Sequence, residues 1–241
     1  PAVDYYVYQK NGDKSYCNTK SIFNGKIYES TNVKLNYDLD YLPMLITEIT
    51  INILTKITSG DNKYKFKTGL DERNIVEWSG NKIKWFYDAN KKGFQYKEYG
   101  EKAIMKSKLA PDTVNIDKFV INYGGGVEGY NYEYVKKSNQ KGVLDMTMYS
   151  QIGETDGLML KKMFDTKIIK FIFLITQYCS GKMVKNEPIV ASSINVPQQT
   201  ITDLYEFYGI KKYQKYIDEV LNDYDESVKP KTKNIETKKK L

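Results

Sequence analysis

The stretch LMLKKMFDTKIIKFIFLITQY, residues 158–178, is the most apolar part of the chain and decides the fold that the sequence predicts. Its apolar side chains are too dense to remain exposed on a monomer, and Ser180-Gly181 follow as a stop signal. We therefore predict one long buried helix here. The core residues that we expect in and near it are Met146, Met148, Met159, Met163, Phe164, Phe171 and Phe173.

The residues before this helix show strand patterns. Lys118–Tyr123, Tyr130–Val135 and 142–149 each have strand character, and 82–99 alternates aromatic with charged residues around Asn90-Lys91-Lys92-Gly93. Such alternation is typical of an antiparallel hairpin with one solvated face. Near the N-terminus we expect strands at 5–9 and 15–18 around Asn11-Gly12-Asp13, and a second tight turn at Asn24-Gly25 between 21–23 and 26–28.

Shorter helical patterns flank these strands. Apolar residues follow helical spacing over 45–57, with Pro43 near the first turn and Gly60-Asp61 at the end. Residues 200–208 and 211–223 form a second helical pair, joined at Gly209-Ile210. We predict an α+β fold in which antiparallel strands and hairpins pack on the long helix. Residues 1–228 form a single domain with a strand-rich segment at 1–40, and 229–241 are a Lys-rich disordered tail.

The composition excludes several kinds of enzyme. The chain has no histidine, and its two cysteines, Cys17 and Cys179, are far apart, so it lacks the residues for Ser-His-Asp, Cys-His and zinc chemistry. Mechanisms that use carboxylates, Lys or Tyr stay open. The longest apolar run, 168–175, is interrupted by Lys170 and is too short for a bilayer, and the N-terminus shows no secretory signal. We expect a reducing intracellular location and no membrane anchor.

The net charge of +7 is unevenly distributed. Residues 229–241 hold six Lys and one Glu, a charge of +5, which leaves +2 for the other 228 residues. Lysine accounts for 36 of the 37 basic residues, and Arg73 is the remaining one. Charge alone is therefore weak evidence for a nucleic-acid partner.

Six motifs occur in a fixed order. They are Tyr41-Leu42-Pro43, the hairpin 82–99, KFVINYGGG (118–126), GVLDMTMYSQI (142–152), KIIKFIFLITQYCSG (167–181) and SSINVP (192–197). This succession resembles the C-terminal target-recognition region of Eco57I-type and TaqI-like adenine-specific DNA methyltransferases, which belong to restriction-modification systems of bacteria and large DNA viruses. The resemblance spans most of 41–209.

The resemblance implies recognition without methyl transfer. In that family a preceding domain carries the S-adenosylmethionine loop and an Asn-Pro-Pro-Tyr type motif for the flipped adenine. This chain contains no Pro-Pro pair. We expect no cofactor here, with S-adenosylmethionine bound by a catalytic domain elsewhere. The expected partners are double-stranded DNA and a catalytic methyltransferase or endonuclease domain or subunit, in a bacterial cytoplasm, a viral factory or a virion.

The expected DNA-binding residues fall into two groups. Base reading and close backbone approach are assigned to Asn122, Tyr123, Gly124, Gly125, Gly126, Tyr130, Asn131 and Tyr132. Phosphate contacts are assigned to Lys82, Lys84, Lys91, Lys92, Lys136 and Lys137, and Arg73 is the one guanidinium that could read guanine. Each has a structural alternative. The glycines form a plain turn, the tyrosines pack across strands, the lysines solubilise the surface, and Arg73 pairs with Asp71 or Glu72.

Three other functions compete with DNA recognition. Nucleotide binding is disfavoured, because the run GGGVEG lacks the Lys-Ser/Thr of a phosphate loop. A metal-dependent nuclease site could combine Asp71, Glu77, Asp145 or Glu154 with Lys82 or Lys84, but their spacing does not require it. A structural or assembly protein, derived from the same scaffold and no longer reading DNA, is the alternative that the nearly neutral body keeps open.

Overall fold

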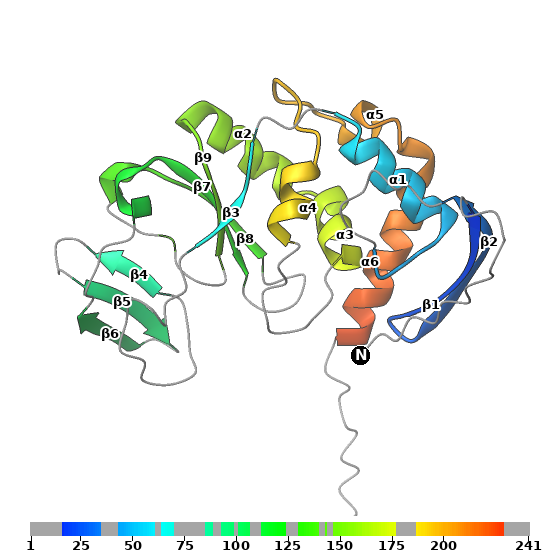
Figure 1. The fold of residues 1–241 in the computed structure, drawn as a ribbon, viewed down its shortest axis with the longest axis horizontal. Helices are drawn as coiled ribbons and strands as arrows, with labels where there is room; N and C mark the ends of the chain where they lie inside the picture. The colour runs from blue at the N-terminus through cyan, green and yellow to red at the C-terminus, as the bar shows by residue number, and fades with distance from the viewer. Residues whose placement is uncertain are drawn as a thin grey trace, which may run out of the picture.

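The computed structural model describes residues 16–34, 43–60, 64–69, 85–88, 93–98, 101–106, 112–123, 130–139, 143, 147–176 and 187–228. These residues form an α+β fold, as the sequence predicts. A four-stranded antiparallel sheet lies on one side of the molecule, a two-stranded ribbon lies on the other, and the helices lie between them (Figure 1).

The four-stranded sheet has the order β3 (Lys67–Thr68), β9 (Thr147–Gln151), β7 (Lys118–Tyr123), β8 (Tyr130–Val135). The sequence predicts β7 and β8 with these bounds, from a short apolar run in β7 and from the alternation of β8 with the period of a strand. The strand predicted at 142–149 is β9, which begins at Thr147. The two-residue β3, which pairs with β9, was not predicted.

The prediction of one continuous helix at 158–178 is wrong. The chain instead forms α2 (Glu154–Phe164) and α3 (Lys167–Thr176), separated at Asp165-Thr166. The backbone N–H of Asp165 donates to the Lys161 carbonyl at 3.1 Å and closes α2, and the Thr166 hydroxyl donates to the Met163 carbonyl at 2.7 Å. Short polar side chains compete in this way with the helical ladder. The break places α2 against the sheet and lets α3 pack against α4 (Glu187–Ser193) and α6 (Gln214–Val228).

Phe164 lies at the centre of an aromatic cluster that joins these layers. Its ring centroid is 5.5 Å from that of Phe119 in β7, 5.7 Å from those of Phe66 and Tyr132, and 6.2 Å from that of Phe173 in α3. Offset and edge-to-face arrangements at such distances are favourable. The predicted core residues are buried in this region, except for Met146, which lies outside the described residues.

Gly157 sets the distance between α2 and the sheet. A Cβ atom at this position would lie 2.4 Å from Cδ2 of the Tyr134 ring. Real Cβ atoms do not approach other atoms so closely, so the ring or the helix would have to move. The absence of a side chain at Gly157 therefore allows α2 to contact β8 directly.

We predict that Gly157→Ala destabilises the protein by about 1 kcal/mol, and by no more than about 2 kcal/mol, which is the difference between two opposed effects. Alanine favours a helix over glycine by about 1 kcal/mol, but overpacking costs about 1 to 3 kcal/mol. Urea unfolding followed by circular dichroism measures the difference. Thr155→Ala, on the exposed side of the same helix, is the matched control and should be neutral or slightly stabilising. A Gly157→Ala variant as stable as the control would contradict the close packing.

The two-stranded ribbon confirms one predicted hairpin. Strands β1 (Tyr16–Phe23) and β2 (Lys26–Lys34) are joined at Asn24-Gly25, whose φ angles are +50° and +77°. Positive φ at both central residues fits a tight hairpin turn, which Asn-Gly favours. The predicted strand 15–18 is the start of β1. The expected strand at 5–9 and the turn at 11–13 lie outside the described residues.

Helix α1 (Glu48–Thr58) begins later than predicted, and Pro43 is not in its first turn. Thr47 is the N-cap, and it forms a capping box with Thr50. The preceding backbone is bonded elsewhere, since Met44 N donates to the Ile175 carbonyl at 2.6 Å and Ile46 N donates to Ser21 Oγ at 3.1 Å. These bonds hold 44–46 outside the helix. The predicted stop at Gly60 is close to the observed end.

The C-terminal part is helical. It comprises α4 (Glu187–Ser193), α5 (Leu204–Phe207), the 3₁₀ turn η6 (Lys211–Tyr213) and α6 (Gln214–Val228). The predicted pair is present, with Gly209 at φ +61° between its members. The first member is shorter than predicted because Asp203 caps it, and its carboxylate accepts from the Glu206 N–H at 3.1 Å. Helix α4 was not predicted, and the tail 229–241 lies outside the described residues.

The predicted hairpin at 82–99 is present as β4 (Trp85–Asp88) and β5 (Gly93–Glu98), with Asp88 opposite Gly93. A third strand, β6 (Glu101–Lys106), extends it and was not predicted. Figure 1 shows this sheet beside the four-stranded sheet, at the end of the molecule away from α6 and the ribbon.

Candidate nucleic-acid interface

The β7–β8 hairpin pairs four of the predicted base-reading residues across its strands. Asn122 and Asn131 are direct partners, followed by Tyr123 and Tyr130 at the ends of the two strands. Asn131 is exposed. Eight expected residues lie outside the described part of the chain; they are Gly124, Gly125, Gly126, Lys82, Lys84, Lys91, Lys92 and Arg73.

The tyrosine rings at the predicted base-stacking positions contact the core, since Tyr130 is part of it and Tyr132 packs against it. The Tyr130 ring stacks on Phe173 at a centroid distance of 4.7 Å and is only 9% exposed. Tyr132 meets Phe164 edge-on, and burial, followed by the charge of Asp165, raises the pKa of its hydroxyl. A ring that is packed on both sides cannot receive a base. The structural alternative, cross-strand and interlayer packing, accounts for both residues.

The two predicted phosphate-binding lysines that the structure describes have acidic neighbours. Lys136 Nζ lies 2.7 Å from Glu154 Oε1, an exposed ion pair that raises the pKa of the lysine, first through the hydrogen bond and then through the charge. The backbone N–H of Lys137 donates to the Asp117 carboxylate at 2.7 Å. A phosphate would therefore have to compete with Glu154 for Lys136.

The nuclease hypothesis gains no support from the described residues. Asp71, Glu77, Asp145, Lys82 and Lys84 lie outside them, and Glu154 is paired with Lys136. Within the part of the chain that is described, no three His, Cys, Asp or Glu residues are grouped so that they could hold a metal ion. Nor does any described helix have the length and apolar character to cross a membrane.

Lys118 anchors the base of the hairpin. It is 1% exposed, and its Nζ donates to the carbonyls of Thr113 at 2.8 Å and Ile116 at 3.2 Å. The Val143 N–H donates to Thr113 Oγ1 at 2.7 Å and fixes the same turn. A buried ammonium is tolerated when carbonyl oxygens replace its water. The hairpin is therefore held firmly at Lys118 and Val135, while Asn131 near its tip is exposed.

We predict that Lys118→Met lowers the free energy of unfolding by about 2 to 3 kcal/mol. Methionine keeps the apolar stem but leaves two carbonyls without their charged donor, and buried hydrogen bonds to charged groups contribute about 1.5 to 3 kcal/mol. Chemical denaturation measures the loss. Lys161→Met, on the exposed side of α2, is the control and should change stability by less than about 0.5 kcal/mol. Equal effects of the two substitutions would show that Lys118 is not an anchor.

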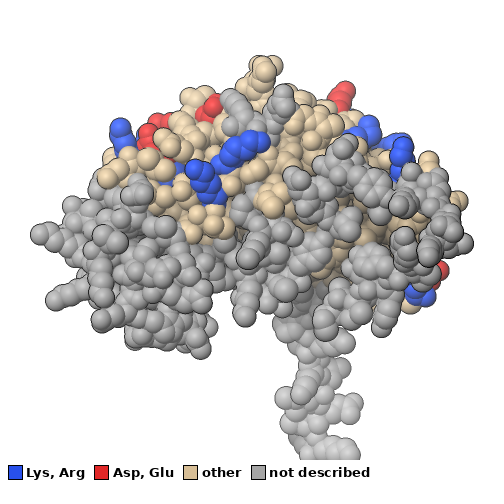
Figure 2. Space-filling model, viewed as in Figure 1, with Lys and Arg blue, Asp and Glu red and all other residues tan. Residues whose placement is uncertain are grey.

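The described surface does not present a field of one sign in the view of Figure 2. Lysines occur there in separate groups, and carboxylates lie between and beside them. A wide positive face of the kind that dominates non-specific DNA binding is therefore not formed by the described residues on this side. Recognition through this body would have to depend on local contacts.

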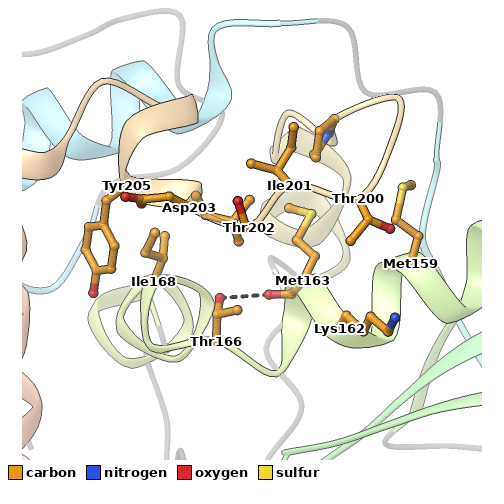
Figure 3. A pocket seen from close by; sticks show the side chains of 12 residues that line it. Met159, Lys162, Met163, Thr166, Ile168, Thr200, Ile201, Thr202, Asp203 and Tyr205 are labelled. Carbon is orange, nitrogen blue, oxygen red and sulfur yellow. Dashed lines mark hydrogen bonds between the residues drawn. The ribbon is translucent and has the colours of Figure 1, made fainter.

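A hollow of about 280 Å³ lies between α2, the start of α3 and residues 197–205 (Figure 3). Its inner wall is apolar, with Met159, Met163, Ile168 and Ile201 among its residues. Its polar lining includes Thr200, Thr202 and Tyr205, and the Tyr205 hydroxyl is buried with no hydrogen-bond partner among the described residues. Figure 3 shows the Lys162 side chain directed outward and the Tyr205 hydroxyl beyond Ile168.

The carboxylate of Asp203, which also lines this hollow, accepts from Glu206 N–H and Lys211 Nζ. The Thr166 hydroxyl donates to the Met163 carbonyl (Figure 3). Two of the polar side chains that line the hollow, Asp203 and Thr166, are therefore already bonded within the fold. Sequence reasoning missed the hollow, and the pair Met159 and Met163, one helical turn apart, was the available signal.

Several buried tyrosines make the fold sensitive to high pH. Burial is the main cause that raises the pKa of Tyr216 and of Tyr205 to about 12, and Asp218 and Asp203 add to the effect at Tyr205. Burial also raises the pKa of Tyr208. Because an unfolded tyrosine ionises near pH 10, the folded state favours the protonated phenol. The corresponding stability is complete below pH 10 and is lost as the pH rises towards 12.

We predict an alkaline unfolding transition between about pH 10 and 12, with tyrosinate absorbance and loss of helical circular dichroism changing together. Tyr216→Phe keeps the ring against Phe171 but removes the ionisable group, so its transition should move to higher pH. Tyr16→Phe, at an exposed position, is the matched control. Complete tyrosine ionisation before any loss of helix would contradict the prediction.

Comparison with known proteins identifies no relative, since no family model, curated protein or solved structure matches this chain.

Proposed function

We propose that this chain is a non-catalytic module that recognises double-stranded DNA, as the target-recognition domain of an adenine methyltransferase of the restriction-modification type. The methyltransferase or endonuclease chemistry and its S-adenosylmethionine belong to another domain or subunit in this proposal. The observation that carries it is the β7–β8 hairpin, which is anchored at Lys118 and carries an exposed Asn131 next to its tip.

The edge strand β8 offers an amide group for the reading of a groove. Strands β7 and β8 form one edge of the four-stranded sheet, in which β7 also pairs with β9. The exposed Asn131 lies on β8, and an asparagine amide matches the N6 and N7 edge of adenine. Precise recognition also requires a firm support. The sheet provides it, because Lys118, Phe119 and Ile121 of β7 are buried.

The second predicted hairpin supports the same proposal. Strands β4 and β5 lie at the same end of the molecule as the four-stranded sheet, away from α6 and the ribbon (Figure 1). Both elements to which the resemblance assigns DNA contact are thus antiparallel hairpins at one end of the chain's fold. Non-specific affinity would come mainly from lysines, including the six in 229–241.

A structural or assembly role is the second candidate, and specific observations favour it. Tyr130 is used in the core, and Lys136 is paired with Glu154. A structural protein derived from the recognition scaffold would keep the packing of that scaffold. It would have few free contacts at the expected site. Binding measurements separate the two candidates.

We predict that the full chain selects particular sequences from a random duplex library, and that the logarithm of its affinity falls with the logarithm of salt concentration by about 0.9 per phosphate contact. Asn131→Ala should weaken binding to the selected duplex about 5- to 100-fold, since one bidentate base contact contributes about 1 to 3 kcal/mol. Fluorescence anisotropy measures both effects.

The matched control is Asn139→Ala, an exposed asparagine beyond the base of the same hairpin, which should bind normally. A chain ending at Val228 should retain its sequence preference with a smaller salt slope, because the tail contributes phosphate contacts only. If that truncation abolishes binding, or if the library yields no preferred sequence, the recognition proposal fails and the structural role is favoured.

A further inference from the structure

A groove of about 450 Å³ lies between the β1–β2 ribbon and α6. The ribbon contributes Lys26 and Tyr28, and α6 contributes Tyr216, Glu219 and Asp223 among others. The hairpin function proposed above uses none of these residues. The groove is therefore separate from the proposed DNA-reading hairpin.

The charged groups of the groove leave it negative. Asp223 receives Lys26 Nζ at 2.5 Å and the Tyr28 hydroxyl at 3.4 Å, so one lysine is already bound there. Among the described residues, Glu219 pairs weakly with Lys215, at 3.8 Å between Oε1 and Nζ, and the two side chains are 60% and 90% exposed. One lysine against two carboxylates gives the lining a net charge of −1.

Two tyrosine rings complete the walls. Tyr216 is held by Thr47, with 3.2 Å between the two hydroxyl oxygens, and its ring meets Phe171 edge-on. Burial, then Asp223 and then Glu219 raise the pKa of Tyr28, which agrees with a negative potential at this place. Carboxylates beside aromatic rings form an environment that attracts an ammonium group.

The sequence supplies a complementary segment close by. Helix α6 ends at Val228, and the next thirteen residues carry six Lys and one Glu. Along the helix, Val228 is about 14 Å from Glu219, whereas thirteen residues can span about 43 Å. A segment tethered at this distance has an effective concentration in the millimolar range.

We propose that the Lys-rich segment 229–241 docks into the groove between α6 and the β1–β2 ribbon, with lysine ammonium groups against Glu219 and Asp223. Individual exposed ion pairs are weak and are screened by salt, so the docked state is reversible. A polyanion competes for the same lysines. The groove thus holds the most basic part of the chain away from non-specific contacts until a polyanion binds it.

Zero-length carbodiimide cross-linking of the full chain, followed by peptide mapping, tests this proposal. At about 50 mM salt, lysines of 229–241 should couple mainly to Glu219 and Asp223, and the yield should fall severalfold at about 500 mM salt. The pair Lys26 and Asp223 provides an internal positive control. Added heparin should reduce the tail cross-links in the same way as salt.

The variant Glu219→Gln should reduce the tail cross-links to Asp223 by about threefold, because one of the two carboxylates is lost. The matched control Glu206→Gln changes an exposed glutamate in α5 and should leave the pattern unchanged. Both variants should retain the circular dichroism of the wild type, since both side chains are on the surface.

Three outcomes would overturn the proposal. They are tail lysines that couple equally to distant carboxylates such as Glu48 and Glu206, an absence of tail cross-links, and cross-links that join isotopically labelled to unlabelled chains in a mixture. The last result would show that the groove receives the tail of a second copy. The docking is independent of DNA reading by the β7–β8 hairpin, so each proposal can fail while the other stands.

Discussion

The contact of Phe164 with both layers is the interaction on which the rest of the structure depends. Phe164 is the last residue of α2, and its ring touches Phe119 of the sheet and Phe173 of α3. The helical layer breaks immediately after it, and α2 then packs on the sheet while α3 packs on α4 and α6. Gly157, two turns earlier on the same side of α2, permits the close approach to the sheet by leaving room for Tyr134. Hydrophobic burial and backbone geometry therefore act together here.

The sequence predicts strands better than helix boundaries in this chain, for physical reasons. Strand β8 alternates along most of its length, β7 contains a short buried apolar run, and Asn24-Gly25 has a conformational preference that few residue pairs share. The helical stretch 158–178 is apolar throughout, so its pattern is the same for one helix or two. The signal for the break is Asp165-Thr166 alone, and its effect depends on hydrogen bonds to Lys161 and Met163. Likewise, the sequence pattern places Pro43 near the first turn of a helix that starts at 45. The pattern does not reveal the bonds that hold 44–46 outside the helix, because they come from distant residues.

In the candidate site, too, local sequence patterns predict some features, and contacts with distant residues decide the others. Alternation predicts that Tyr130 and Tyr132 share one face of β8, and they do, but it does not say which face meets the helices. That choice is made by α2 and α3, which cover the tyrosines and leave Asn131 on the exposed side. The pairing of Lys136 with Glu154 joins the end of a strand to the start of the next helix, and no local pattern encodes it. The anchoring of Lys118 also depends on a turn, Asp112–Asn115, that sequence spacing does not reveal.

The distribution of charge separates two properties that are often combined in one surface. The described body carries lysines and carboxylates in local pairs, such as Lys26 with Asp223 and Lys167 with Asp218, which tie the ribbon and α3 to α6. These charged side chains therefore join neighbouring elements of the body to one another. The excess positive charge lies beyond α6, in a segment whose contacts with a polyanion would not depend on base sequence. In the proposed recognition role, selectivity would come from the shape and the amide groups of the β7–β8 hairpin, while the lysines of 229–241 would set the strength of attraction.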